Sequence, residues 1–263
     1  MNKEKRQVFQ NKILSFYEEN KRSFPWRQTT DPYKIWISEI MLQQTPTTRV
    51  IPKYEDWMNS FPTVDDVREA SFSTILDYWD GLGFNNRAKW IYQASEKIVK
   101  EYEGVLPEGR EELKELPGIG PYTSRAIRIF AHNKDEVTVD TNIRRVFIHE
   151  LNLSEDIEKD DLYDIAWRVL PEGKSRKWHN ALMDYGSMEA TSRETGIEPE
   201  TKQGEFEGSN RWYRSKILKK VRQNPLKIQE IKAEYGEKGK KALQTLEKDE
   251  MVERDGETIK IPR

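Results

Sequence analysis

Leu-Pro-Gly-Ile-Gly-Pro-Tyr-Thr, residues 116–123, is the stretch of sequence that decides the fold. One predicted helix, over residues 110–115, ends here, two glycines turn the chain, and a second predicted helix begins at once. Gly118 and Gly120 let the backbone approach a ligand closely, and the N–H groups at a helix start attract an anion. The stretch therefore predicts a phosphate-binding site of the helix–hairpin–helix kind, which binds the DNA backbone. An ordinary turn between packed helices is the alternative.

The first 190 residues carry the pattern of an all-α domain. Apolar residues recur at helical spacing between short breaks, and no strand pattern appears before residue 208. The segment 32–42 is apolar almost all round, so we expect its helix to be buried. The spacing predicts helices over residues 4–21, 32–42, 50–61, 64–70, 72–79, 86–102, 110–115, 122–133, 141–151, 161–170 and 176–188.

The last third of the chain has a different pattern. Residues 191–208, polar with three glycines and a proline, predict a linker. Beyond it we expect helices over 211–223, 226–235 and 238–249, then a β-hairpin over 251–261 that turns at Asp-Gly. Three helices and a hairpin are the outline of a winged helix, here called the C-terminal module (residues 209–263). A small wing for packing or protein docking is the alternative.

Charge is divided unevenly along the chain. The C-terminal module has 15 Lys and Arg against 9 Asp and Glu, a net charge of +6. The first 208 residues have 29 against 37, a net charge of −8. A basic module on an acidic body favours a polyanionic partner such as DNA, although a solvated basic helix explains the charge equally well.

Composition excludes several classes of protein. With no cysteine, the chain cannot form disulfides, use a thiol nucleophile or ligate an iron–sulfur cluster through cysteine. Its three histidines lack the spacing of a zinc site, so we expect no metal in the reaction. No run of about 18 apolar residues occurs, and the charged start lacks a signal-peptide core. We therefore expect a cytoplasmic, nucleoid-associated protein without a membrane partner.

Two carboxylates are the candidates for chemistry. Glu39 lies inside the apolar helix predicted over 32–42, where burial favours the neutral form and makes a general acid. Asp140 stands between an apolar stretch and a predicted helix start. Helix capping alone would explain an Asp at that position. A neutral acid and a charged acid together are the pair used in glycoside hydrolysis.

Three segments together resemble the MutY-type adenine DNA glycosylases of the helix–hairpin–helix (HhH-GPD) superfamily. The first joins Pro-Trp-Arg (25–27) to Asp-Pro-Tyr-Lys-Ile-Trp-Ile-Ser-Glu-Ile-Met-Leu-Gln-Gln-Thr (31–45). The second joins Gly-Leu-Gly-Phe (81–84) to Arg-Ala (87–88), and the third is the hairpin with Asp140. The resemblance covers roughly residues 8–190. It implies a two-lobed all-α glycosylase domain over residues 1–190, with the target base flipped into a cleft between the lobes.

The resemblance also implies roles for individual residues. It makes Glu39 the catalytic acid, Asp140 the carboxylate that stabilises the sugar cation, and Tyr122 and Asn142 their polar support. Related enzymes that also cut the strand have Lys at the position of Tyr122, so we expect a monofunctional enzyme. Base recognition is expected at Trp26, Arg27, Leu42 and Asp184, and DNA binding at Gln44 (the wedge), Phe84 (the intercalating aromatic), Gly118, Gly120, Thr123 and Arg144.

The sequence departs from the family in several places. Ser-Met-Glu-Ala-Thr (187–191) stands where the family's four cluster cysteines begin, so no iron–sulfur cluster is expected. We expect Trp167, Trp178, Leu182 and Met183 to supply apolar packing there instead. The C-terminal module replaces the family's 8-oxoguanine-reading domain, and Asp184 replaces a Glu. The resemblance allows a structural Na⁺ or K⁺ at the hairpin.

The leading hypothesis is a glycosylase of base excision repair that removes adenine opposite guanine or 8-oxoguanine. The alternative enzyme removes thymine or uracil mispaired with guanine, since relatives of that kind also have Asp and Tyr at positions 184 and 122. A non-catalytic DNA-binding protein on the same scaffold is the third hypothesis. The partner in each case is double-stranded DNA, containing a mismatched or oxidised base pair in the two enzymatic cases, and we expect a monomer.

Overall fold

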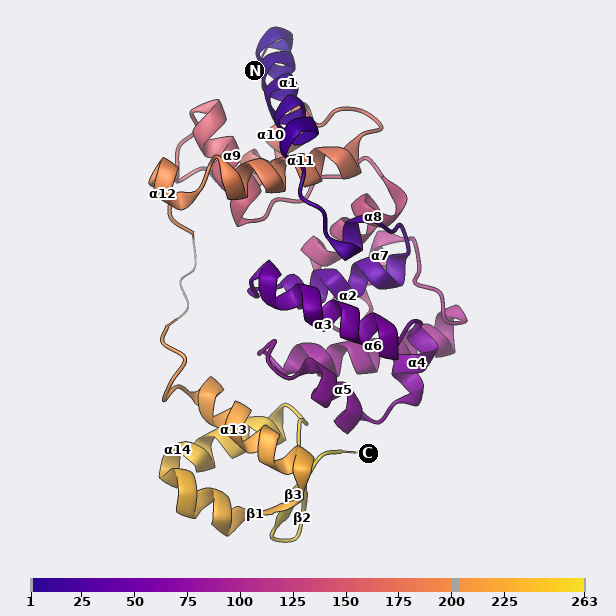
Figure 1. Ribbon diagram of the computed structural model, residues 1–263, viewed down its shortest axis with the longest axis vertical. Helices are drawn as coiled ribbons and strands as arrows, with labels where there is room; N and C mark the ends of the chain where they lie inside the picture. The colour runs from indigo at the N-terminus through magenta and orange to yellow at the C-terminus, as the bar shows by residue number, and fades with distance from the viewer. Residues whose placement is uncertain (1, 200–203, 263) are drawn as a thin grey trace. The chain divides into compact units, whose positions relative to one another are not determined.

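The computed structural model describes residues 2–199 and 204–262 (Figure 1). As predicted, the chain is mainly helical, with one small sheet near its C-terminus. Within the described residues, no helix combines the length and the apolar character needed to cross a membrane. The chain divides into two compact units. The first consists of Met1–Glu39, Glu108–Lys114 and Ile119–Lys202, and the second of Ile40–Pro107, Glu115–Gly118 and Gln203–Arg263.

The first unit is built around four packed helices. Phe9 and Ile13 pack with Phe147, Trp178 and Leu182 in one core, and the ring of Phe9 meets Trp178 edge-on with centroids 5.6 Å apart. Each such buried side chain contributes about 1.5–3 kcal/mol. The helices of this unit are α1 (Lys3–Asn20), α7 (Arg110–Lys114), α8 (Pro121–His132), α9 (Thr141–Leu151), α10 (Lys159–Val169), α11 (Ser175–Met188) and α12 (Ser192–Thr195), with the 3₁₀ turn η1 (Pro25–Arg27) and most of α2 (Pro32–Leu42).

One of the packing predictions for this unit is wrong. Trp178 and Leu182 are each 1% exposed, and Met183 packs against the core, as expected. Trp167, however, is 49% exposed. The buried stripe of α10 runs through Leu162, Ala166 and Val169, and at 100° per residue position 167 points away from it.

The second unit contains a helical lobe and the C-terminal module. The lobe comprises α3 (Thr47–Ser60), α4 (Val64–Glu69), α5 (Phe72–Trp79) and α6 (Asn86–Tyr102). Thr63 and Asp66 form a capping box at the start of α4, and the Ser71 hydroxyl caps α5. These polar caps explain why the predicted starts of both helices agree with the observed ones.

The C-terminal module has the predicted winged-helix elements and one strand that the pattern did not predict. α13 (Asn210–Gln223) is followed by β1 (Leu226–Lys227), α14 (Ile228–Lys248), β2 (Glu253–Asp255) and β3 (Thr258–Lys260). The sheet order is β1-β3-β2, both pairs antiparallel, with Ile259 opposite Leu226 on one side and Arg254 on the other. Pairing with β3 therefore takes residues 226–227 out of the predicted helix. Gly236 (φ 58°, ψ −146°) breaks α14 near the predicted boundary between two helices.

The predicted linker is only partly described. Residues 192–195 form the short helix α12, and residues 200–203 lie outside the described residues. The division into a glycosylase domain, a linker and a C-terminal module stays a prediction.

Candidate active site

Glu39 is a buried carboxyl group on an apolar helix. It lies on α2 between Ser38 and Ile40, both 1% exposed, and is itself 9% exposed. Burial, followed by the negative charge of Asp140, raises the pKa of Glu39 from 4.5 to about 8, against an opposing effect of Arg27. At neutral pH Glu39 is therefore a neutral acid with a proton to donate.

Asp140 is the N-cap of α9, so the capping role expected from the sequence is present. Its Oδ1 accepts the backbone N–H of Ile143 at 2.7 Å, and its Oδ2 accepts the Asn142 side-chain amide at 3.4 Å. Burial raises the pKa of Asp140 above its ordinary value, although these two hydrogen bonds and the charge of Arg145 act in the opposite direction. The hydrogen-bond donors favour the charged form of Asp140, and this negative charge contributes to the raised pKa of Glu39.

Tyr122 and Asn142 complete this group within the first unit. Tyr122 lies in the first turn of α8, and burial, followed by the charges of Glu39 and Asp140, raises its pKa well above 10. Its hydroxyl thus keeps its proton and is a donor at neutral pH. Asn142 bonds Asp140 through its amide and accepts from Arg145 at 3.3 Å. A Cβ at Gly186 would come within 2.8 Å of the Asn142 carbonyl oxygen, so glycine allows α11 to approach α9 here.

His179 positions the segment before Asp140, a role that the sequence did not reveal. Its Nε2 accepts the backbone N–H of Thr138 at 3.2 Å, and its Nδ1 lies 2.8 Å from the Ser175 carbonyl oxygen. Burial lowers the pKa of His179 to about 4, so the ring is neutral and accepts and donates one hydrogen bond each. A histidine 39 positions beyond Asp140 gives no local signal of this contact.

Asp184 is completely buried, and both of its carboxylate oxygens accept hydrogen bonds from arginines. Arg27 donates to Oδ2 at 2.8 Å and to Oδ1 at 3.0 Å, in bidentate geometry. Arg22 donates its Nε to Oδ1 at 2.7 Å and its backbone N–H to Oδ2 at 3.0 Å. Burial raises the pKa of Asp184, but the bonds from Arg27 and Arg22 outweigh it and hold the pKa below its usual range. Asp184 therefore fixes Arg27, and its contact with an adenine edge stays a prediction.

An aromatic pair covers the same arginines. Phe24 stacks on Trp26, with ring centroids 5.2 Å apart and an interplanar angle of 16°. The guanidinium carbons of Arg22 and Arg27 lie 5.1 and 4.8 Å from the Phe24 ring centroid. Trp26 and Arg27 are predicted from the sequence, whereas Arg22 and Phe24 are not. The run Arg-Ser-Phe-Pro-Trp-Arg (22–27), with an arginine at each end of an aromatic cluster, was the available signal.

The hairpin has the predicted local geometry. Gly118 has φ 78°, and a Cβ there would lie 2.8 Å from the Cβ of Trp90, so both the backbone conformation and the space require glycine. Gly120 is the N-cap of α8, and Pro121 is its first residue. Thr123 is 3% exposed, and its contact with a phosphate stays a prediction. Arg144 is half-buried and donates to the Glu155 carbonyl at 2.5 Å.

The remaining predicted residues belong to the second unit. Gln44 is exposed and has φ 54°, whereas Leu42 is half-buried. Phe84 is 41% exposed and has φ 48°. They are two of six non-glycine residues with left-handed backbone conformation in the described part of the chain, three of which end helices.

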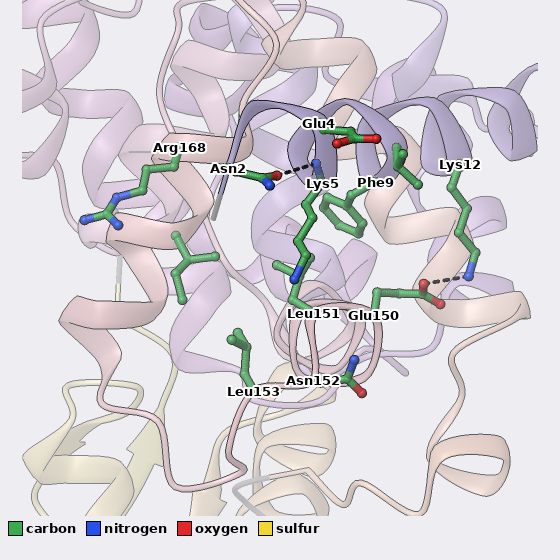
Figure 2. Close-up of a pocket in the computed structure, with 12 residues that line it drawn as sticks. Asn2, Glu4, Lys5, Phe9, Lys12, Glu150, Leu151, Asn152, Leu153 and Arg168 are labelled. Carbon is green, nitrogen blue, oxygen red and sulfur yellow. Dashed lines mark hydrogen bonds and ion pairs between the residues drawn. The ribbon is translucent and has the colours of Figure 1, made fainter.

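A pocket of about 900 Å³ lies elsewhere in the first unit (Figure 2). It is lined by α1, the end of α9 with the residues that follow it, and α10, and Lys12 pairs with Glu150 at its edge at 2.6 Å. None of the predicted site residues lines it. The pocket is therefore separate from the carboxylate pair.

The buried acid should also affect stability. Glu39→Gln is expected to stabilise the fold, and the gain should be larger at about pH 8 than at about pH 5. Between the unfolded pKa and about 8 the native protein holds a proton that the unfolded chain has lost. The wild-type free energy of unfolding therefore falls as pH rises, by at most about 1.4 kcal/mol per pH unit. Urea unfolding of both proteins at the two pH values measures this, and an equal difference at both contradicts the raised pKa.

A neutral acid beside a second acid at the start of a helix, with a Gly-rich hairpin between helices, is typical of a DNA repair enzyme. Residues 37–172 match the family model described as HhH-GPD superfamily base excision DNA repair protein. The chain belongs to this superfamily, which confirms the resemblance predicted from the sequence.

Relatives at moderate identity include several named adenine DNA glycosylase. The protein of Buchnera aphidicola subsp. Baizongia pistaciae is 35% identical over 184 residues, covering 69% of this chain and 52% of that protein. The protein of Mycolicibacterium smegmatis is also 35% identical, covering 69% and 63%, and the human protein is 31% identical over 197 residues, covering 70% and 36%. The match therefore spans roughly a third to two thirds of these relatives' lengths.

Solved structures give the same fold. A thermostable thymine-DNA glycosylase is similar with a TM-score of 0.66 and 30% identity, covering 74% of this chain and 94% of that one. A DNA complex of endonuclease III has a TM-score of 0.65 at 16% identity, covering 76% and 91%. The latter likeness shows the fold alone.

The iron–sulfur cluster typical of the MutY-type family does not fit this chain, since there is no cysteine to ligate it. In the corresponding segment, Nη1 of the buried Arg145 donates to the carbonyls of Gly186 and Ala190, each at 3.1 Å. This side chain ties the end of α11 to α9.

Proposed function

We propose that this chain is a monofunctional DNA glycosylase that hydrolyses the N-glycosidic bond of adenine mispaired with guanine or 8-oxoguanine in double-stranded DNA. The observation that supports the proposal is the burial of Glu39, which raises its pKa to about 8, in the same compact unit as Asp140, whose negative charge contributes to that rise. A non-catalytic DNA-binding protein gains nothing from burying an acid at this cost.

In the proposed reaction Glu39 donates its proton to N7 of the flipped adenine. The glycosidic C–N bond then breaks, its electron pair leaves with the base, and the sugar acquires oxocarbenium character. Asp140 stabilises that positive charge, and water adds to the sugar carbon and gives up a proton to the Glu39 carboxylate, which restores the acid. The products are free adenine and an abasic site. Tyr122 has no amine to form a Schiff base, so the strand stays intact.

Base recognition would fall to Arg27, with Trp26 beside it. Arg27 lies close enough to Glu39 to oppose its pKa rise, and its guanidinium donates to Asp184 and to the Arg22 carbonyl, which restrict its position. An adenine edge would then meet the arginine held by Asp184, while Leu42 supplies an apolar contact. Tyr122 and Asn142 support the two acids.

DNA would be bound through sites in both units. The hairpin amides at Gly118, Gly120 and Thr123, with Arg144, would bind phosphates, and Gln44 and Phe84 would enter the base stack. The C-terminal module adds a net charge of +6, which would strengthen binding through phosphate contacts.

Removal of thymine or uracil mispaired with guanine is the second candidate. It is favoured by the 30% identity to a thymine-DNA glycosylase, of which the match covers 94%. These pyrimidines have no N7, so Glu39 would act on a carbonyl oxygen or through water.

A panel of duplexes decides between these functions. With enzyme in excess over duplexes containing A·8-oxoguanine, A·G, T·G and U·G, we expect release of adenine and an alkali-labile abasic site. Release of thymine or uracil with adenine untouched selects the second candidate. Binding without release of any base would establish the non-catalytic protein.

A further inference from the structure

Arg87 is a buried side chain that the proposed reaction does not use. It lies at the start of α6 and is 3% exposed. Its two terminal nitrogens, with four N–H groups between them, lie within hydrogen-bond distance of six acceptors, all in the second unit. Nη1 bonds the carbonyls of Ile40 (2.7 Å), Met41 (3.1 Å) and Gln43 (2.8 Å), and Nη2 bonds Thr45 Oγ1 (3.2 Å) and the carbonyls of Leu82 (2.9 Å) and Gly83 (3.0 Å).

These acceptors belong to two separate stretches of chain. Residues 40–45 end α2 and contain Gln44, and residues 82–83 immediately precede Phe84. The proposed function places both of these side chains in the DNA. Nη1 holds carbonyls at the end of a helix, which have no partner within the helix, while Nη2 reaches both stretches. A planar guanidinium with several donors in fixed directions suits this arrangement, whereas an ammonium has only three donors.

Arg87 also contacts the aromatic residue directly. Its guanidinium carbon lies 5.4 Å from the Phe84 ring centroid and 5.1 Å from that of Trp79. Gln44 and Phe84 both have left-handed backbone conformation, which costs free energy in a non-glycine residue. Arg87 bonds the residue before each of them, at the carbonyls of Gln43 and Gly83.

The C-terminal module contacts α6 through Asn86 and Lys89, which lie on either side of Arg87 in the sequence. Asn86 donates to Asp249 at 3.1 Å and accepts from Arg214 at 3.0 Å, and Arg214 pairs with Asp249 at 2.7 Å. Lys89 donates to the Asp249 carbonyl at 2.7 Å. In addition, Arg211 lies 5.7 Å from the Phe84 ring centroid. The residues on both sides of Arg87 are thus fixed by α13 and by the end of α14.

We infer that Arg87 is a positioning residue that holds the Gln44 and Phe84 stretches in one geometry, so that base extrusion and aromatic insertion occur together, and that the C-terminal module buttresses it. This inference rests on the proposed function for the roles of Gln44 and Phe84. It assigns the module a role within the protein in addition to any contact with DNA.

Arg87→Lys in the full-length chain tests the inference. Two duplexes are compared: one with 2-aminopurine at the target position, whose fluorescence rises on unstacking, and one with a tetrahydrofuran abasic analogue, which needs no extrusion. We expect the fluorescence rise to be lost and the single-turnover rate to fall about 100-fold. Affinity for the abasic duplex should change little. An equal loss of affinity for both duplexes, or an unchanged fluorescence rise, overturns the inference.

Milder variants keep the test valid if Arg87→Lys does not fold. Thr45→Val removes one acceptor of Arg87, together with the hydroxyl contacts to the carbonyls of Gln43 and Leu82, and should lower the rate about fivefold. Its control is Ser95→Ala, a buried hydroxyl on α6 that bonds only the Tyr92 carbonyl within the helix among the contacts described. Arg214→Gln should reduce the fluorescence rise, whereas Lys219→Gln, an exposed change on the same helix, should not. Equal behaviour of each variant and its control contradicts the inference. A wild-type protein that unstacks 2-aminopurine but excises no base contradicts the proposed function alone.

Discussion

Replacement of Glu39 by Gln should lower the single-turnover rate constant of base release by about 10³-fold on whichever duplex the wild-type protein cleaves, because it removes the proton donor. Gln is nearly isosteric and neutral, like the protonated acid that it replaces. Affinity for the same duplex should therefore be retained. The measurement is base release with enzyme in excess, with duplex affinity determined in parallel.

The pH dependence of the wild-type rate gives a second measure of Glu39. Since the pKa of Glu39 is raised to about 8, its protonated form predominates below that pH and declines above it. The rate constant should fall tenfold per pH unit above about 8 and also fall at low pH, as Asp140 becomes protonated.

Glu136→Gln serves as the control for Glu39→Gln, since Glu136 is a half-buried acid paired with Arg128 and outside the site. A Glu39→Gln variant as fast as this control removes Glu39 from the mechanism.

Asp140→Asn should lower the rate constant by about 10²- to 10³-fold, as expected for the loss of one preorganised electrostatic contact. Asn is as good an N-cap as Asp, so α9 should keep its start and the protein its melting temperature. The substitution therefore separates capping from the stabilisation of a sugar cation. It also removes a charge that raises the pKa of Glu39, so the high-pH decline should shift to lower pH.

Two outcomes would count against this role of Asp140. A rate constant equal to that of the wild type would show that Asp140 only caps α9. A lower rate accompanied by a large loss of thermal stability would show that the effect comes from the fold. Differential scanning calorimetry of both proteins under the kinetic conditions distinguishes these cases.

The parts of the fold that local chemistry determines could be predicted from the sequence. Asp140 and Ser71 cap their helices through bonds to residues three positions away, and α5, α6 and α9 have their predicted bounds. Glu39 could be recognised because burial in an apolar helix raises the pKa of a carboxyl group. These inferences need only nearest neighbours along the chain.

Other features depend on contacts between distant parts of the chain. Arg22 and Asp184 are 162 residues apart in sequence, and Asn86 and Asp249 are 163 apart. Likewise, β1 exists only because residues 258–259 pair with it, and Trp167 is exposed because its position on α10 faces away from the core. No local pattern contains this information. The positions of Arg87 and its six acceptors follow from tertiary structure in the same way.

Direct titration of the Glu39 carboxyl is the measurement that tests the central claim most closely. With ¹³C-labelled glutamate and Glu39→Gln for assignment, the δ-carbon shift reports the protonation of this one group. A midpoint near 8, which moves down in Asp140→Asn, is the predicted result. A midpoint near the ordinary 4.5 would mean that Glu39 is ionised at neutral pH and has no proton to give to a departing base.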